Sequence, residues 1–185
     1  GKLYEKYGED FVRLVTDYHV EHAGISRFVK FRHFHEHLLG LAYNDELGKN
    51  LSHNYSQLVF DAIVEAPYVE GAVKFLEKYY QQIPLFVASA TPEEELRKII
   101  FRRGMSRYFS NIYGSPSTKY EILRLILSTH SWPPERVLMV GDSLADLEGA
   151  QSTKTDFMGV ELSKNLTVFS ESKCINNFSQ LEISL

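Results

Sequence analysis

The sequence predicts an α/β protein: a Rossmann-like parallel sheet with helices on both faces, preceded by an all-helical segment. Two observations lead to this fold class. From residue 69 onward, short apolar runs alternate with amphipathic stretches, which is typical of a parallel sheet. Residues 1–65 instead show only the three- and four-residue periodicity of helices. We therefore expect two domains, a helical one at 1–65 and an α/β one at 66–185.

Three helices are expected in the first segment, at about 3–18, 27–39 and 45–64. Gly24 ends or bends the first helix, and Gly40 is a plausible end for the second. Ser26 is a candidate N-cap for the second helix, and Asn44 or Asp45 for the third. This segment shows no strand pattern.

The α/β segment is expected to contain strands at 84–88, 111–113, 137–140, 157–160 and near 173–175. Helices are expected at 69–80, 92–103 and 118–129, and a further helix should follow the third strand and run to about residue 151. Pro92 suits the first position of its helix, and Thr118 is a candidate N-cap. Because each of the first three strands is followed by a helix, the loops after these strands should meet at one edge of the sheet.

Composition and charge narrow the function classes. Of the 185 residues 44% are apolar, and 20 Lys and Arg stand against 24 Asp and Glu, a net charge of −4. This balance offers no basic surface for nucleic acid and no polybasic patch for a membrane, and no apolar run reaches the length of a membrane span. No signal peptide is apparent, and Cys174 is the only cysteine. We therefore expect a cytoplasmic protein without internal disulfides, monomeric or homodimeric.

Two of the loops after strands carry a hydroxyl group and a lysine. At Ser89-Ala90-Thr91-Pro92, a hydroxyl and the N–H groups of a helix start can bind a phosphate oxygen, although an ordinary helix cap is the alternative. Lys119 falls in the first turn of a helix, where the helix dipole disfavours a cation, so its position suggests an anionic partner. The alternative for Lys119 is a solvated surface lysine.

The third loop carries two carboxylates. Asp142 follows the apolar run that begins at Val137, and Asp146 lies four positions later on the same helical face. Paired carboxylates at this point favour a hard cation such as Mg²⁺. The alternative is that Asp142 is a simple N-cap and Asp146 a solvated acid of the first turn. A hydroxyl, a lysine and two carboxylates at successive strand ends would converge on one crevice. Their combination therefore favours a binding site over the alternatives given for each loop, namely helix caps and solvated side chains.

Together these motifs resemble those of the haloacid dehalogenase-like phosphohydrolases. Ser89, Lys119 and Gly141-Asp142-x-x-x-Asp146 match the second, third and fourth motifs of that family. Residues 1–65 resemble the helical cap that is inserted after the first strand in the phosphoglycolate-phosphatase and β-phosphoglucomutase branch. The resemblance covers essentially the whole chain, and the motifs are specific in combination.

The resemblance implies Mg²⁺-dependent hydrolysis of a small phosphorylated metabolite through an aspartyl-phosphate. Ser89 would hydrogen-bond a phosphoryl oxygen, assisted by the N–H of Ala90. Lys119 would neutralise charge on the nucleophile and the transferring group. Asp142 would ligate Mg²⁺, and Asp146 would complete the metal end of the site by orienting a metal-bound water or Lys119.

One family motif has no counterpart in the sequence. The family's first motif is Asp-x-Asp on the central strand, which supplies the nucleophile and the general acid/base. Asp10 and Asp17 lie in helical patterns and do not match it. We expect an upstream strand that would lie between the strands carrying Ser89 and Asp142. Without it those two strands should leave a gap, with unpaired backbone groups at about 1–3 kcal/mol each.

The helical segment offers candidate specificity residues. Arg27 and Lys30 follow the turn at Gly24 and could reach an anionic part of the substrate, the alternative being a solvated surface. His33 and His37 are four residues apart and could share a face, but they lack the order and the third ligand of a zinc motif.

Four alternative interpretations remain open at this level. A phosphomutase of the same family would need the same motifs. A catalytically inactive phosphate-binding or scaffold protein would fit the absence of a nucleophile, and so would a truncated form of an active enzyme. A dehalogenase fits less well, because its chemistry needs no metal ion and gives the pair of Asp142 and Asp146 no evident role.

Overall fold

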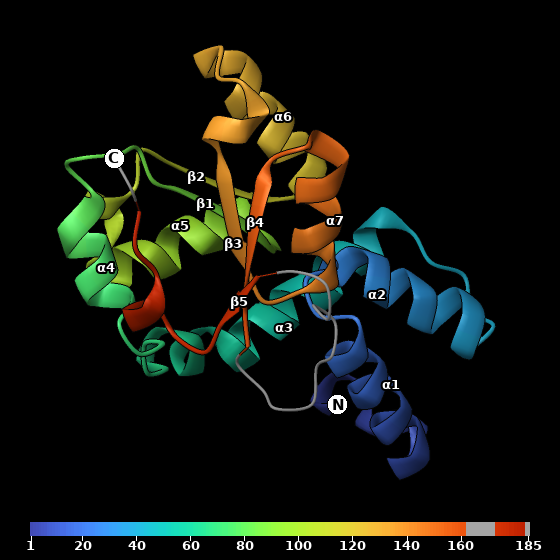
Figure 1. The fold of residues 1–185 in the computed structure, drawn as a ribbon. Helices are drawn as coiled ribbons and strands as arrows, with labels where there is room; N and C mark the ends of the chain where they lie inside the picture. Colours follow the sequence, from blue (N-terminus) through green and yellow to red (C-terminus); the bar gives the residue numbers. More distant parts are fainter. Residues whose placement is uncertain (162–172, 184–185) are drawn as a thin grey trace. The chain divides into compact units, whose positions relative to one another are not determined.

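The structure is a computed structural model that describes residues 1–161 and 173–183 (Figure 1). Its internal contacts divide the chain into two compact units, Gly1–Glu65 and Ala66–Leu185. We call them the helical unit and the α/β unit and describe each by itself. Among the described residues, no helix is both long enough and apolar enough to cross a membrane.

The helical unit consists of η1 (Lys2–Tyr7), α1 (Glu9–Glu21), α2 (Arg27–His33), the π-helical turn η2 (Phe34–Leu38) and α3 (Asp45–Glu65). The expected first helix is interrupted at Gly8, which has a φ of 91° that glycine adopts readily. The second helix changes to π geometry after His33. Ser26 occupies the N-cap position of α2 without a capping hydrogen bond from its side chain, whereas the Asn44 side chain accepts one from Leu47 N (2.8 Å) at the start of α3.

The core of the helical unit is largely aromatic. Tyr4, Val15, Phe31 and Phe34 are buried together, and the rings of Tyr4 and Phe34 meet edge to face with centroids 5.5 Å apart. Such tilted contacts suit the quadrupoles of aromatic rings. Aromatic rings therefore form much of the core of the helical unit.

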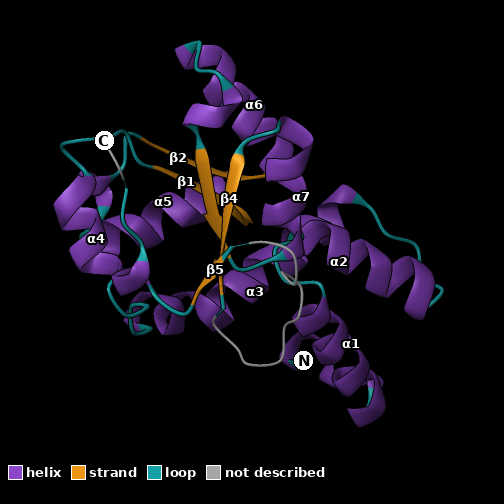
Figure 2. Cartoon of the chain, in the orientation of Figure 1, coloured by secondary structure: helices purple, strands orange, loops and turns teal. Residues whose placement is uncertain are grey.

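The α/β unit contains α4 (Ala72–Tyr79), β1 (Phe86–Pro92), α5 (Glu93–Arg102), η3 (Ser106–Tyr108), β2 (Asn111–Ser115), α6 (Lys119–His130), η4 (Pro134–Arg136), β3 (Leu138–Gly141), α7 (Leu144–Thr153), β4 (Asp156–Val160), β5 (Cys174–Ile175) and η6 (Phe178–Gln180) (Figure 2). The alternation of strands and helices predicted from the sequence is confirmed. Pro92 lies one position earlier than expected, since it is the N-cap of α5 rather than its first residue.

Helices cover both faces of the strands. Met139 of β3 packs with Ala150 of α7 on one face, whereas the next residue, Val140, packs against the cluster around Phe75 of α4 on the other. On β1, Val87 joins the cluster on α5, and Ala88 joins the cluster of α6 and α7. This two-residue alternation is that of a strand buried on both sides.

The strands form two parallel sheets, not one. β1 pairs with β2, and β3 pairs with β4, which pairs with β5. Ala88 of β1 and Met139 of β3 belong to the same hydrophobic cluster, so both strands lie in the same layer. Within the described residues, however, no ladder joins β1 to β3. The gap that the sequence predicts between the strands carrying Ser89 and Asp142 is therefore present.

Candidate active site

Lys119 connects β1 to α7. It is the first residue of α6, whose N-cap Thr118 forms a reciprocal capping box with Glu121. Its Nζ donates to the carbonyl oxygen of Ala88 at 2.6 Å and lies 2.6 Å from Oδ1 of Asp146. The Lys119 side chain is only 12% exposed. The alternative of a solvated surface lysine is therefore wrong, because this ammonium is held between β1 and α7.

Asp146 is fixed by three neighbouring groups. Its Oδ2 accepts hydrogen bonds from Ser143 N at 3.1 Å and from Ser143 Oγ at 2.7 Å, while Oδ1 faces Lys119. A Cβ atom on Gly141 would collide with the Asp146 carboxyl group, so glycine is required there for this approach. Asp146 is 3% exposed, which rules out a solvated first-turn acid.

The N-cap of α7 is Ser143, not Asp142 as the simple alternative had it. Ser143 and Asp146 form a capping box. The sequence already indicated this capping box, because Ser-x-x-Asp before a helix has the spacing of the motif. Asp142 therefore does not cap α7.

Replacing Ser143 with Ala should destabilise the α/β unit by about 1–2 kcal/mol, because it removes one capping hydrogen bond and one donor to a buried carboxylate. The matched control is Thr118→Ala at the exposed capping box of α6, which should cost less. Urea unfolding measures both. Equal losses for the two variants would show that Ser143 does not support Asp146.

Asp142 follows β3 directly and keeps an exposed side chain. Partial desolvation of its carboxylate and the negative charge of Asp146 raise the pKa of Asp142, while its own backbone and the Lys119 ammonium oppose the rise. The mutual influence of these groups places Asp142 in the same electrostatic environment as Lys119 and Asp146. Two carboxylates and one ammonium therefore converge beyond the carboxyl end of β3.

Ser89 and Ala90 lie on β1 immediately after Ala88, the residue whose carbonyl oxygen Lys119 binds. The hydroxyl oxygen of Ser89 accepts a hydrogen bond from Thr91 N at 3.2 Å. In the described part of the chain, no hydrogen bond uses the Ser89 hydroxyl proton, which leaves it able to donate to an anion. The five residues predicted for the site thus come from the ends of β1, β3 and the first turns of α6 and α7.

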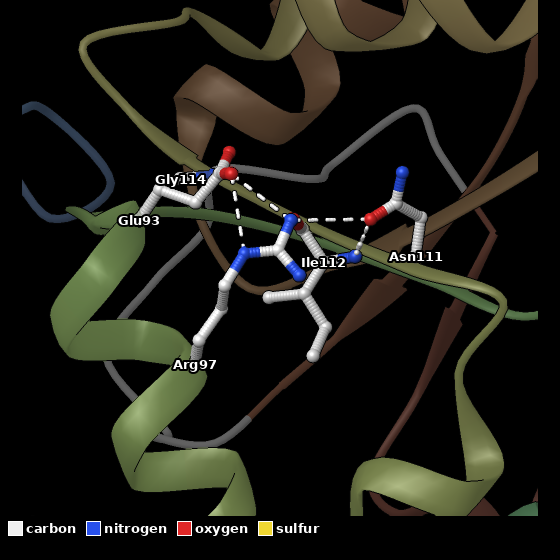
Figure 3. A network of polar contacts seen from close by, with 5 residues as sticks. All are labelled: Glu93, Arg97, Asn111, Ile112 and Gly114. Atoms are coloured by element: carbon white, nitrogen blue, oxygen red, sulfur yellow. Dashed lines mark hydrogen bonds and ion pairs between the residues drawn. The ribbon is translucent and has the colours of Figure 1, made fainter.

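A polar network that sequence reasoning missed holds the ends of β1 and β2 together (Figure 3). Glu93, at the start of α5, accepts a hydrogen bond from Gly114 N (3.1 Å) through Oε2 and pairs with Arg97 at 2.9 Å through Oε1. Arg97 also donates to the carbonyl oxygen of Ile112 at 2.6 Å. The i, i+4 spacing of Glu93 and Arg97 was the available sequence signal. The network ties the start of α5, directly after β1, to β2.

The carboxylates of the site can offer one ligand to Mg²⁺. Among residues 1–161 and 173–183, no three His, Cys, Asp or Glu side chains gather as a metal cluster. Both oxygens of Asp146 are engaged by Ser143 and Lys119, which leaves Asp142 as the carboxylate available to a cation. One carboxylate fits Mg²⁺, which commonly keeps several waters and completes its shell with substrate phosphate.

The two specificity candidates lie in the helical unit. Arg27 and Lys30 are 8% and 4% exposed, so the alternative of a solvated surface is wrong for both. His33 and His37 have ring centroids 5.2 Å apart, without a third ligand among the described side chains.

A parallel α/β sheet with polar groups at the carboxyl ends of its strands defines a ligand-binding α/β protein of the Rossmann-like class. The model of the haloacid dehalogenase-like hydrolases matches residues 8–160. The chain belongs to this family.

Similar proteins agree with the assignment. A 5'-nucleotidase from Pseudomonas aeruginosa is 33% identical over 81 residues, which are 41% of this chain and 37% of that protein. The chain therefore matches little more than a third of that relative's length. A candidate phosphatase from Clostridium difficile is 25% identical, with a TM-score of 0.61 over 79% of this chain and 72% of that one. A β-phosphoglucomutase from Clostridium difficile shares the fold, with 17% identity and a TM-score of 0.69 over 86% and 74% of the two chains.

Proposed function

We propose that these residues form the phosphoryl-transfer site of a Mg²⁺-dependent phosphomonoester hydrolase acting on a small phosphorylated metabolite. The observation that carries this proposal is the position of Lys119, whose Nζ contacts both the backbone beside Ser89 and the carboxylate of Asp146. Membership in the hydrolase family supports the reaction class.

Each residue has a defined task in this proposal. The hydroxyl of Ser89 and the N–H of Ala90 hydrogen-bond the phosphoryl oxygens, and the ammonium of Lys119 offsets the negative charge that gathers in the transition state. Asp146 positions that ammonium, since it is itself fixed by Ser143. Asp142 would hold Mg²⁺, which when bound supplies Lewis-acid stabilisation of the phosphoryl oxygens.

The nucleophile in this proposal is a carboxylate that a strand delivers between β1 and β3. The gap between the two sheets supports this position, because it lies beside both Ser89 and Asp142 and both strand edges that face it lack ladder partners among the described residues. Attack on phosphorus forms an aspartyl-phosphate and releases the alcohol, and water then hydrolyses the acyl-phosphate.

The experiment is a hydrolysis assay on the complete protein, with an aryl phosphate as substrate. We expect turnover with Mg²⁺, loss of turnover with excess EDTA and recovery when Mg²⁺ is restored. Turnover that EDTA leaves unchanged would overturn the metal-dependent mechanism.

A phosphomutase is the second candidate, favoured by the structural similarity to β-phosphoglucomutase. It would interconvert sugar phosphates and depend on a bisphosphate activator, while releasing little free phosphate. An inactive phosphate-binding protein would show no turnover and no aspartyl adduct with Mg²⁺ and beryllofluoride.

A further inference from the structure

β2 is an edge strand of its sheet. It pairs with β1 on one side, and no ladder joins its other side to any part of residues 1–161 and 173–183. An edge strand presents N–H and C=O groups to which a strand of another molecule can bond. We call this side the outer edge of β2. It is a place where a second copy of the chain could extend the sheet.

The sequence of β2 offers little protection against such pairing. Residues 108–115 contain no charged residue and no proline, and they include Phe109, Ile112 and Tyr113, which favour strands. Short segments with high β-propensity, low charge and no proline tend to pair between molecules. Charged residues and prolines on the strand itself are common means of preventing this. Protection of β2 must therefore come from groups that lie outside its own run of apolar residues.

Two side chains bond to the backbone of Ile112 in the way that a neighbouring strand would (Figure 3). Ile112 N donates to Asn111 Oδ1 at 2.8 Å, and the carbonyl oxygen of Ile112 accepts from Arg97 Nη2 at 2.6 Å. Arg97 Nη2 also donates to Asn111 Oδ1 at 3.2 Å, which joins the two side chains. A strand offers its neighbour the same two groups, an acceptor for an N–H and a donor for a C=O. Asn111 and Arg97 therefore satisfy the groups to which an added strand would bond.

Glu93 holds the Arg97 side chain in this position. Its Oε1 accepts from Arg97 Nε at 3.2 Å and from Nη2 at 2.9 Å, and its Oε2 accepts from Gly114 N at 3.1 Å. These hydrogen bonds lower the pKa of Glu93, so its carboxylate is charged at neutral pH. The side chains of Arg97 and Glu93 are 45% and 40% exposed, and such an ion pair adds little stability by itself. The network is better explained by the backbone groups that it covers.

We propose that Arg97 and Asn111 close the outer edge of β2 and so prevent the chain from pairing edge to edge with a second copy. Identical strands can pair antiparallel about a twofold axis, using the same edge in both molecules. Without the two side chains, the N–H and C=O of Ile112 in each copy would be available to the other. The proposal goes beyond the phosphoryl-transfer site and does not depend on it, because none of these residues belongs to that site.

The test is sedimentation velocity of the complete protein over a range of concentrations. The double variant Arg97→Ala/Asn111→Ala should show an average mass that rises with concentration to about twice its starting value, since the expected product is a twofold pair. The unchanged protein should keep the same mass throughout. The matched control is Arg102→Ala, which removes another exposed arginine from α5 and should sediment like the unchanged protein. A double variant whose mass does not depend on concentration would overturn the proposal.

A third variant separates edge pairing from association through a loosened interior. Arg97→Ala/Asn111→Lys also breaks the network, but it places a charge at the start of the edge, where lysine disfavours strand addition. Its mass should stay that of the unchanged protein at every concentration. Association as strong as that of the alanine double variant would show that the edge is not the contact, and the proposal would be wrong.

Amide hydrogen exchange examines the closed edge without relying on association. In the unchanged protein the N–H of Ile112 should exchange slowly, although no strand among the described residues pairs with this side of β2. Asn111→Ala removes the acceptor and should speed this exchange by about tenfold, the size expected for one hydrogen bond. Exchange at Ile112 of the unchanged protein as fast as in an exposed loop would contradict a closed edge.

Discussion

Replacing Lys119 with Met is expected to destabilise the α/β unit by about 3–5 kcal/mol, because it leaves the carboxylate of Asp146 buried without its counter-charge. The side chain of Asp146 is 4% exposed, so water cannot replace the lost ammonium. The variant also loses the hydrogen bond to Ala88 that ties α6 to β1. Urea unfolding followed by circular dichroism measures the change.

Two variants serve as controls for the Lys119 experiment. Lys98→Met on the exposed side of α5 should change the free energy of unfolding little. Adding Asp146→Asn to Lys119→Met should restore part of the loss, since the buried charge disappears with its partner. Strictly additive losses for Lys119→Met and Asp146→Asn would contradict a direct pair.

Replacing Asp142 with Asn should lower Mg²⁺-dependent hydrolysis of an aryl phosphate by at least about a hundredfold. Stabilisation by a bound metal amounts to several kcal/mol, and each tenfold in rate corresponds to about 1.4 kcal/mol. Because the Asp142 side chain is exposed, the variant should remain folded. Initial rates across a range of Mg²⁺ concentrations measure the effect.

The matched control for Asp142 is Asp156→Asn. Asp156 is exposed and lies at the start of β4, paired with Leu138, at the opposite end of the sheet from Asp142. This variant should keep the full rate. If both variants retain activity, Asp142 has no place in the catalytic site.

The sequence predicted the layers of the α/β unit because apolar runs and helix caps are local signals. Thr118 is the N-cap of α6 as expected, and β3 ends before Asp142. The change from α to π geometry after His33 had no such local signal. The first residue of the π-helical turn, Phe34, packs edge to face against Tyr4 of η1, a contact between residues distant in sequence.

The candidate site was predictable in its residues but not in its contacts. Spacing placed Lys119 and Asp146 at neighbouring strand ends, but the sequence alone could not show that they form a buried pair. The Ser-x-x-Asp spacing indicated the capping box of Ser143 and Asp146, but it could not show that Asp146 is buried. Burial of Lys30 and Arg27 likewise depends on contacts with α1 and α3 that are distant in sequence.

The position of a bound phosphate mimic tests the proposed phosphoryl-transfer site most directly. A crystal structure of the complete protein grown with Mg²⁺ and tungstate would show it, because tungsten is located by anomalous scattering. We expect tungstate within hydrogen-bonding distance of Ser89 Oγ and Lys119 Nζ, with a cation bound to Asp142. Tungstate bound elsewhere, with no density between Ser89 and Lys119, would contradict the account.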